Sequence, residues 1–188
     1  MGKVIVLEGL PASGKTTLAN HFCDRFGFIK VNESIGRLSG IHLIGSQTAI
    51  FEDTKMKYAK ASLAAGNSII DRGYPSLLAW DYCTEQLHAT KNFREKEQWI
   101  TYSIQKNEIF EPDAYFYLKI DQATSLRRRF RKTTKSDVWS GVAGMDHCQC
   151  FYNQFFSNLK TSAKIIAIDA TETLPRVIAA AEKHYHDI

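Results

Sequence analysis

Short apolar runs alternate with amphipathic stretches along the whole chain. Runs rich in β-branched and aromatic residues predict five strands, at residues 4–8, 28–31, 68–71, 114–120 and 164–168. Between them, apolar positions recur every three to four residues, which is the spacing of one helix face. This alternation predicts an α/β fold, in which a mostly parallel sheet carries helices on both of its faces.

Helix signals fill the intervals between the predicted strands. Leu18, Phe22 and Phe26 repeat every four residues and Gly27 follows them, which predicts a helix with an apolar face and a glycine cap. Further helices are expected at residues 48–65, from residue 75 onward, at 94–109 and after residue 173. Because the chain has no internal repeat and no linker, residues 1–188 are expected to form a single domain.

Composition narrows the class of protein. The chain has 188 residues, 44% of them hydrophobic, with 24 basic and 20 acidic side chains and a net charge of +4. So mild an excess does not by itself indicate a nucleic-acid partner. Four cysteines are too few for a disulfide framework, and no apolar run is long enough for a signal peptide or a membrane span. We therefore expect a globular cytoplasmic protein with no membrane partner.

A phosphate-binding motif follows the first predicted strand. Residues 9–16, Gly-Leu-Pro-Ala-Ser-Gly-Lys-Thr, match the pattern G-x-x-x-x-G-K-[ST], in which backbone N–H groups and a helix N-terminus surround phosphate oxygens. Lys15 would reach the β- and γ-phosphates, and Thr16 would offer its hydroxyl to Mg²⁺. A chance match in a turn is the alternative, but the strand-loop-helix setting favours a nucleoside triphosphate site. The predicted nucleotide contacts are Gly9, Pro11, Ala12, Ser13, Gly14, Lys15, Thr16 and Thr17.

Charged residues also follow the next two predicted strands. Asp71 and Arg72 come directly after residues 68–70, where the carboxyl ends of parallel strands form a ligand crevice. Asp71 could assist Mg²⁺ or an acceptor, and Arg72 could bind an anionic oxygen. Glu33 occupies the matching place after the second strand and could act as a base. The alternatives are an Asp-Arg pair that stabilises a turn and a capping or solvated glutamate.

A cationic block stands late in the chain. It consists of Arg127, Arg128, Arg129, Arg131, Lys132 and Lys135. The chain has no acidic residue between Asp121 and Asp137, so no nearby carboxylate in the sequence balances these charges. Without these six charges, the rest of the chain has a net charge of −2. Phosphoryl transfer needs positive charge near the transferring group, so we predict a catalytic lid over about residues 127–144. A solvated helix end and a nucleic-acid-binding patch are the alternatives.

With these pieces in place, the chain resembles the P-loop nucleoside and nucleotide kinases, specifically the thymidylate kinase and deoxynucleoside kinase group. The resemblance follows the family order through most of the chain. The segments that carry it are Leu-Glu-Gly-Leu and Gly-Lys-Thr-Thr at 7–17, Ala-Ala-Gly and Ile-Ile-Asp-Arg at 64–72, Pro-Asp and Tyr-Leu at 112–118, Leu-x-Arg at 126–128, and Ile-Asp-Ala at 168–170.

The resemblance implies a three-layer P-loop NTPase fold with a five-stranded parallel sheet. It implies phosphoryl transfer from ATP, with Mg²⁺, to a nucleoside or nucleoside monophosphate. By the same resemblance, Asp71 and Arg72 lie near the acceptor, Arg128 is the lid arginine, and Glu33 is the acid after the second strand. Asp169, where the last strand meets the loop that passes the adenine, is a further predicted nucleotide-binding residue. A homodimer is also common in this group.

The acceptor pocket is predicted less sharply. Candidate substrate-binding residues on segments that should border the crevice are Arg37, Phe51, Lys55, Arg72 and Tyr74. Aromatic residues of this kind can equally fill the core. Lys55 stands where thymidylate kinases have an arginine, so thymidylate specificity stays open.

Two other readings of the function stay open as well. One is a kinase that acts on the hydroxyl of an antibiotic or metabolite. The other is a nucleotide switch or nucleic-acid-binding ATPase, although the chain lacks an Asn-Lys-x-Asp guanine motif and a recognisable nucleic-acid motif. We expect a small-molecule phosphate acceptor and no stable nucleic-acid partner.

Overall fold

The computed structural model describes residues 2–32, 47–129 and 141–188. Its centre is a parallel sheet of five strands in the order β2-β3-β1-β4-β5. The strands are β1 (Val4–Glu8), β2 (Ile29–Val31), β3 (Ser68–Asp71), β4 (Ala114–Lys119) and β5 (Lys164–Asp169). The predicted five-stranded parallel sheet is confirmed, and every strand end lies within one residue of its predicted place.

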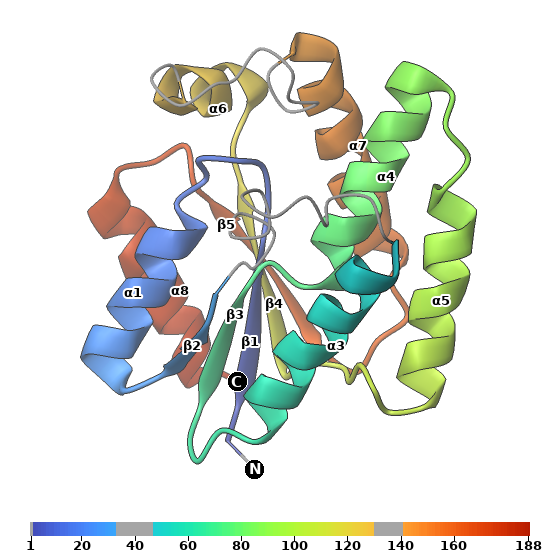
Figure 1. Cartoon of the computed structure of the whole chain (residues 1–188). Coiled ribbons are helices and arrows are strands. Elements are labelled where there is room, and N and C mark those ends of the chain that lie inside the picture. Colours follow the sequence, from blue (N-terminus) through green and yellow to red (C-terminus); the bar gives the residue numbers. More distant parts are fainter. Residues whose placement is uncertain (1, 33–46, 130–140) are drawn as a thin grey trace.

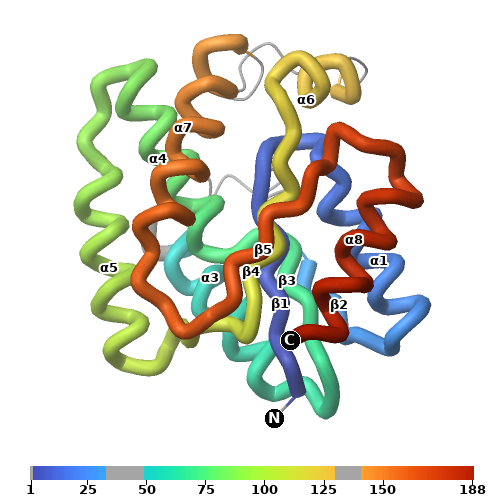
Figure 2. The backbone as a smooth tube through the Cα atoms, turned by 180° about the vertical axis from the view of Figure 1, so that it is seen from behind, coloured from blue at the N-terminus to red at the C-terminus, as the bar shows by residue number. Residues whose placement is uncertain are grey.

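Helices cover both faces of this sheet, so the molecule has three layers (Figures 1 and 2). One face carries α1 and α8, the other carries α3, α4, α5 and α7, and α6 lies beyond the carboxyl ends of the strands. The helices are α1 (Lys15–Phe26), α3 (Gln47–Ser62), α4 (Tyr74–His88), α5 (Phe93–Gln105), α6 (Gln122–Arg129), α7 (Val142–Asn158) and α8 (Leu174–His186).

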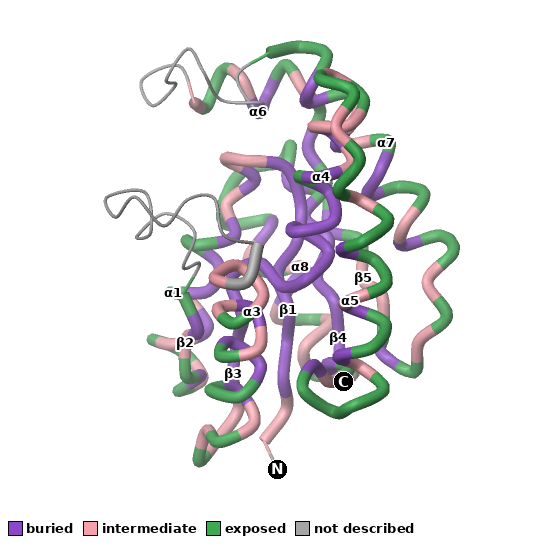
Figure 3. Tube along the Cα trace, turned by 45° about the vertical axis from the view of Figure 1, so that its right-hand side comes forward, coloured by how far each residue is buried: buried purple, intermediate pink, exposed green. Residues whose placement is uncertain are grey.

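Burial explains why the central strands read as continuous apolar runs. All residues of β1 and β3 are buried because helices lie on both faces of the sheet (Figure 3). Phe22 of α1 is fully buried, and its ring meets those of Phe28, Phe116 and Tyr185 at centroid distances of 5.3 to 6.1 Å. The predicted apolar face of the first helix therefore forms the core on that side of the sheet.

Strand order decides which loops meet. β1 pairs with β3 on one side and β4 on the other, and Leu7 stands opposite Asp71 in the β1–β3 register. Both strands end at the same edge of the sheet, where ligands bind in open parallel α/β folds. The segment after β1 and the segment after β3 are therefore neighbours in space.

None of the helices in the described part of the chain is long and apolar enough to cross a membrane.

The aromatic cluster around Phe22 gives a test of the core. We expect Phe22→Ala to lower the free energy of unfolding by about 3 to 5 kcal/mol, because it leaves a cavity among packed rings. Leu63→Ala is the control, since the Leu63 side chain is 84% exposed, and its effect should stay within about 0.5 kcal/mol. Urea unfolding of the two variants measures both values; equal losses would contradict the assignment of Phe22 to the core.

Candidate active site

The phosphate loop connects β1 to α1 and depends on two glycines. Gly9 has a φ of +135°, and a Cβ there would stand 2.4 Å from the Leu118 carbonyl oxygen. Gly14 caps the N-terminus of α1 with a φ of +96°, and a Cβ there would meet nothing within 4 Å. Gly9 thus permits the close approach of the loop to β4, and Gly14 permits the left-handed turn into the helix.

Lys15 extends into the curve of this loop. Its Nζ donates hydrogen bonds to the carbonyl oxygens of Gly9 and Leu10, at 2.9 and 2.8 Å, and to Ser13 Oγ at 3.0 Å. The side chain is buried, so water screens its charge only weakly. The ammonium group lies where the motif requires a cation beside phosphate oxygens.

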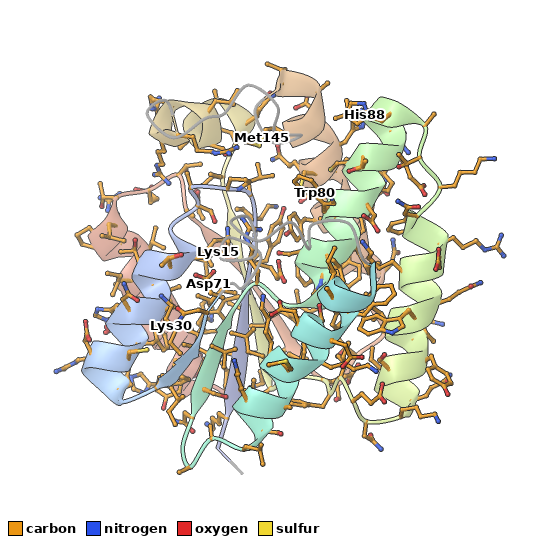
Figure 4. All side chains as sticks on the ribbon, viewed as in Figure 1. Lys15, Lys30, Asp71, Trp80, His88 and Met145 are labelled. Atoms are coloured by element: carbon orange, nitrogen blue, oxygen red, sulfur yellow. The ribbon has the colours of Figure 1, made fainter. Side chains whose placement is uncertain are left out.

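Thr16 and Asp71 meet at the adjoining ends of α1 and β3. Thr16 Oγ1 donates a hydrogen bond of 2.6 Å to Asp71 Oδ2, and Figure 4 shows Lys15 and Asp71 near the same edge of the sheet. The Asp71 carboxylate is 2% exposed, and its Oδ1 has no hydrogen-bond partner among the described residues. A hydroxyl and a buried carboxylate with a spare oxygen fit Mg²⁺, which prefers oxygen ligands.

The protein groups do not form a complete metal cage. Among the described residues, no three His, Cys, Asp or Glu side chains gather closely enough to hold an ion. Mg²⁺ is usually bound by one or two protein groups together with phosphates and water. Thr16 and Asp71 thus fit a metal that arrives with the nucleotide.

Arg72 follows Asp71 in an uncommon backbone conformation. Its φ is +65°, in the left-handed region, and its side chain is 8% exposed. The guanidinium NH1 donates to the Gly9 carbonyl at 3.3 Å and to Ser76 Oγ at 3.1 Å. The structure therefore places Arg72 against the start of the phosphate loop, beside the Thr16–Asp71 pair.

Glu8 is a residue of this site that the sequence reasoning missed. It is fully buried at the end of β1; Oε1 accepts the Gly73 N–H at 2.8 Å, and Oε2 accepts the Ser76 hydroxyl and, at 3.0 Å, the Tyr152 hydroxyl. Burial raises the pKa of Glu8, although these hydrogen bonds and the charge of Arg72 act in the opposite direction. The signal in the sequence was an acidic residue at the end of an apolar strand.

Lys57 was missed as well. It lies on α3 with 6% exposure, and its Nζ donates a hydrogen bond of 3.2 Å to the Arg72 carbonyl oxygen. The sequence offers little to single it out, because Lys55 and Lys60 stand on the same predicted helix. Only the packing of α3 against the end of β3 distinguishes this lysine.

Two predicted acceptor residues on α3 face α5. The Phe51 ring stacks on Trp99 with a centroid distance of 4.1 Å and an interplanar angle of 10°. Lys55 Nζ forms an ion pair with Glu108 at 2.9 Å. Phe51 thus ties α3 to the middle of α5 and Lys55 ties it to the segment after α5, and their contact with an acceptor stays a prediction. Arg37 and Glu33 lie outside the described residues.

Tyr74, a predicted substrate-binding residue, packs into the core, and its contact with an acceptor stays a prediction. Its side chain is 3% exposed, and its ring lies 6.3 Å from that of Tyr58, 6.4 Å from that of Tyr115 and 6.1 Å from that of Phe155. Tyr74 is the first residue of α4, and the first turn of this helix packs into the core. An aromatic residue after a strand fits a pocket or a core equally well, and here the core holds it.

Arg128 contacts the loop after β5. It lies near the end of α6, and its guanidinium donates to the carbonyl oxygens of Ala170, at 2.8 Å, and Thr171, at 3.4 Å. Asp169 shapes the same loop, because its Oδ1 accepts the N–H and the hydroxyl of Thr171. Arg128 thus braces the loop predicted to pass the adenine, and a role in catalysis stays a prediction.

The remaining predicted positions lie in the phosphate loop, at the start of α1 and in the lid. Ser125 of α6 donates a hydrogen bond of 2.7 Å to the Pro11 carbonyl oxygen, which joins α6 to the phosphate loop. Ala12 has a φ of +59°, and Thr17 is exposed in the first turn of α1. The predicted lid begins in α6 and ends in α7, and residues 130–140 lie outside the described part.

Comparisons with known proteins identify the fold. No protein-family model matches the chain, and no curated protein matches its sequence. Solved structures of deoxyadenosine kinase from M. mycoides are similar, each with a TM-score of 0.77.

The three structures differ in their bound nucleotides. The structure with dATP shares 13% identity and is matched over 97% of this chain and 98% of its own. The structure with the products dCMP and dCDP shares 14%, and that with dCTP shares 13%, each matched over 98% of this chain and 100% of its own. The chain therefore shares the three-layer α/β fold of these deoxyadenosine kinase structures, and the predicted fold class is confirmed.

The buried Glu8 carboxyl predicts a pH dependence of stability. Because burial raises its pKa above the ordinary 4.5, its protonated form favours the folded state, and this contribution is lost as the pH rises through the folded-state pKa. We expect Glu8→Gln, which cannot ionise, to become increasingly stable relative to the wild type from pH 4.5 upward, until the difference levels off. Urea unfolding over a pH series measures this, and a difference that shrinks with rising pH would contradict it.

Proposed function

We propose that the protein transfers the γ-phosphoryl group of ATP to a hydroxyl group of a nucleoside, with a nucleoside monophosphate as the alternative acceptor. The observation that carries this proposal is the 2.6 Å contact between Thr16 Oγ1 of the phosphate loop and Asp71 Oδ2. A phosphate loop alone indicates a bound nucleotide, whereas a carboxylate and an arginine beside it supply groups for metal and acceptor. The fold shared with deoxyadenosine kinases supports the acceptor class.

The phosphate loop would hold the donor. Its backbone N–H groups and the N-terminus of α1 bind the phosphates of ATP, and Lys15 neutralises their charge. Thr16 and Asp71 would hold Mg²⁺, which would neutralise charge on the β- and γ-phosphates. The contact of Arg128 with the loop after β5 would keep that loop in place beside the adenine.

The acceptor would approach from the end of β3. Its hydroxyl oxygen forms a bond to the γ-phosphorus, while the bond to the bridging oxygen of the β-phosphate breaks and ADP leaves. Glu33 is the predicted base for the hydroxyl proton. Arg72 would stabilise the negative charge that spreads over the transferring group, since its guanidinium lies against Gly9 at the start of the phosphate loop.

An acceptor panel tests the function. We expect deoxynucleosides to stimulate the release of ADP from Mg-ATP, with a phosphorylated product of matching mass. Nucleoside monophosphates and unrelated hydroxyl-bearing metabolites and antibiotics complete the panel. Turnover with the last group alone would replace the proposed acceptor class, and nucleotide binding with no stimulated turnover would argue against a kinase.

Lys15→Ala tests the donor site. We expect phosphoryl transfer to fall by at least about 100-fold, because a preorganised positive donor beside the developing charge is removed. Lys30→Ala is the matched control: Lys30 lies away from the phosphate loop (Figure 4), and its Nζ donates to Asn20. Circular dichroism should show that both variants are folded. Wild-type turnover by folded Lys15→Ala would contradict the assignment of this loop to the donor.

A further inference from the structure

One peptide bond beside the site is held at both ends by buried charged side chains. It joins Arg72 to Gly73. Its carbonyl oxygen accepts the hydrogen bond from Lys57 Nζ at 3.2 Å, and its N–H donates to Glu8 Oε1 at 2.8 Å. Glu8 is fully buried and Lys57 is 6% exposed, so water screens neither charge strongly and both interact strongly with the peptide.

The charges match the dipole of this peptide. The cation of Lys57 meets the partially negative oxygen, and the carboxylate of Glu8 meets the partially positive N–H. Hydrogen bonds to charged groups are about twice as strong as those between neutral groups. A rotation of the Arg72–Gly73 peptide would break both contacts together, so the two side chains fix its orientation.

The backbone at this point needs such support. Arg72 has a φ of +65°, a value that residues other than glycine, asparagine and aspartate rarely adopt. Gly73 also lies in a tight space, because a Cβ there would stand 2.6 Å from the Tyr58 hydroxyl and 2.8 Å from Val6 Cγ1. A strained conformation persists only where its surroundings determine it, and such strain is often found at functional sites.

Glu8 also reaches the arginine side chain. The Ser76 hydroxyl donates to Glu8 Oε2 and accepts the hydrogen bond from Arg72 NH1 at 3.1 Å. Since its one hydrogen goes to Glu8, the Ser76 oxygen is left free to accept from Arg72. Glu8 therefore contacts the backbone after Arg72 directly and orients the guanidinium through Ser76.

We propose that Glu8 and Lys57 are positioning residues that hold the Arg72–Gly73 peptide in the conformation that directs the Arg72 guanidinium at the transferring phosphoryl group. This inference rests on the proposed function for the role of Arg72. The two hydrogen bonds that hold the peptide do not depend on the proposed function. Neither Glu8 nor Lys57 needs to touch the acceptor or the nucleotide.

Combined substitutions test this role. We expect Glu8→Gln and Lys57→Met each to lower kcat for phosphoryl transfer by about 10- to 100-fold, as supporting residues of a site commonly do. In an Arg72→Ala background each should lower the remaining kcat by less than about threefold, because residues that act through a shared partner are not additive. Lys60→Met, an exposed position on the same helix, is the matched control and should leave kcat unchanged.

These single and double substitutions form a double-mutant cycle, which can overturn the inference in two ways. If Glu8→Gln and Lys57→Met retain wild-type kcat, the two side chains do not position Arg72. If they lower kcat equally with and without Arg72, they act elsewhere in the protein. A merely structural role would give this second pattern, with losses that follow the free energy of unfolding in urea.

Amide hydrogen exchange provides a readout that needs no activity. We expect the Gly73 N–H to exchange at least about tenfold faster in Glu8→Gln and in Lys57→Met than in the wild type, because the peptide loses one of its charged partners. Protection of the Leu18 N–H, which is bonded to the Gly14 carbonyl, serves as the internal reference. Unchanged exchange of the Gly73 N–H would overturn the claim that Glu8 and Lys57 hold the Arg72–Gly73 peptide. The absence of turnover with every acceptor would overturn only the proposed function.

Discussion

Parallel pairing of β1 with β3 is the constraint on which the site depends. The chain places another strand between these two in sequence, yet Leu7 stands opposite Asp71 across their hydrogen-bonded pair. This register carries the phosphate loop and the Asp71–Arg72 segment to the same edge of the sheet. The distance between Thr16 Oγ1 and Asp71 Oδ2, 2.6 Å, follows from it. With β3 elsewhere in the sheet, the phosphate loop would lack its carboxylate.

That edge collects charged side chains in an unusually buried setting. Glu8, Lys15, Lys57, Asp71 and Arg72 all have relative exposures of 8% or less. Buried charges are costly unless they are paired and hydrogen-bonded, and here each takes part in a network built from loop carbonyls, hydroxyls and opposite charges. The raised pKa of Glu8 reflects the free-energy cost of burying its negative charge. A site of this kind gives up stability to hold charge in fixed positions, as the proposed phosphoryl transfer requires.

Helices beyond the sheet connect this edge to the rest of the molecule. Through Ser125 and Arg128, α6 contacts both the phosphate loop and the loop after β5. Tyr152 of α7 donates to Glu8 at the end of β1. The stretches on either side of residues 130–140 are thus anchored to the phosphate loop, the loop after β5 and the end of β1. The cationic block, which gives the chain its net positive charge, begins in the last turn of α6. This helix contacts both the phosphate loop and the loop after β5.

Local patterns in the sequence determined the elements and the phosphate loop. Apolar runs predicted all five strands, and the motif at residues 9–16 specified its own turn because its glycines act through the backbone conformation at their own positions. Asp71 and Arg72 were also predicted from a local pattern, a short charged segment at a strand end. Tertiary structure decided the contacts between distant segments. It placed Tyr74 in the core and Arg128 on the loop after β5, and it brought Glu8 of β1, Lys57 of α3 and Gly73 of the loop after β3 together. A side chain's partner depends on packing that no local pattern contains.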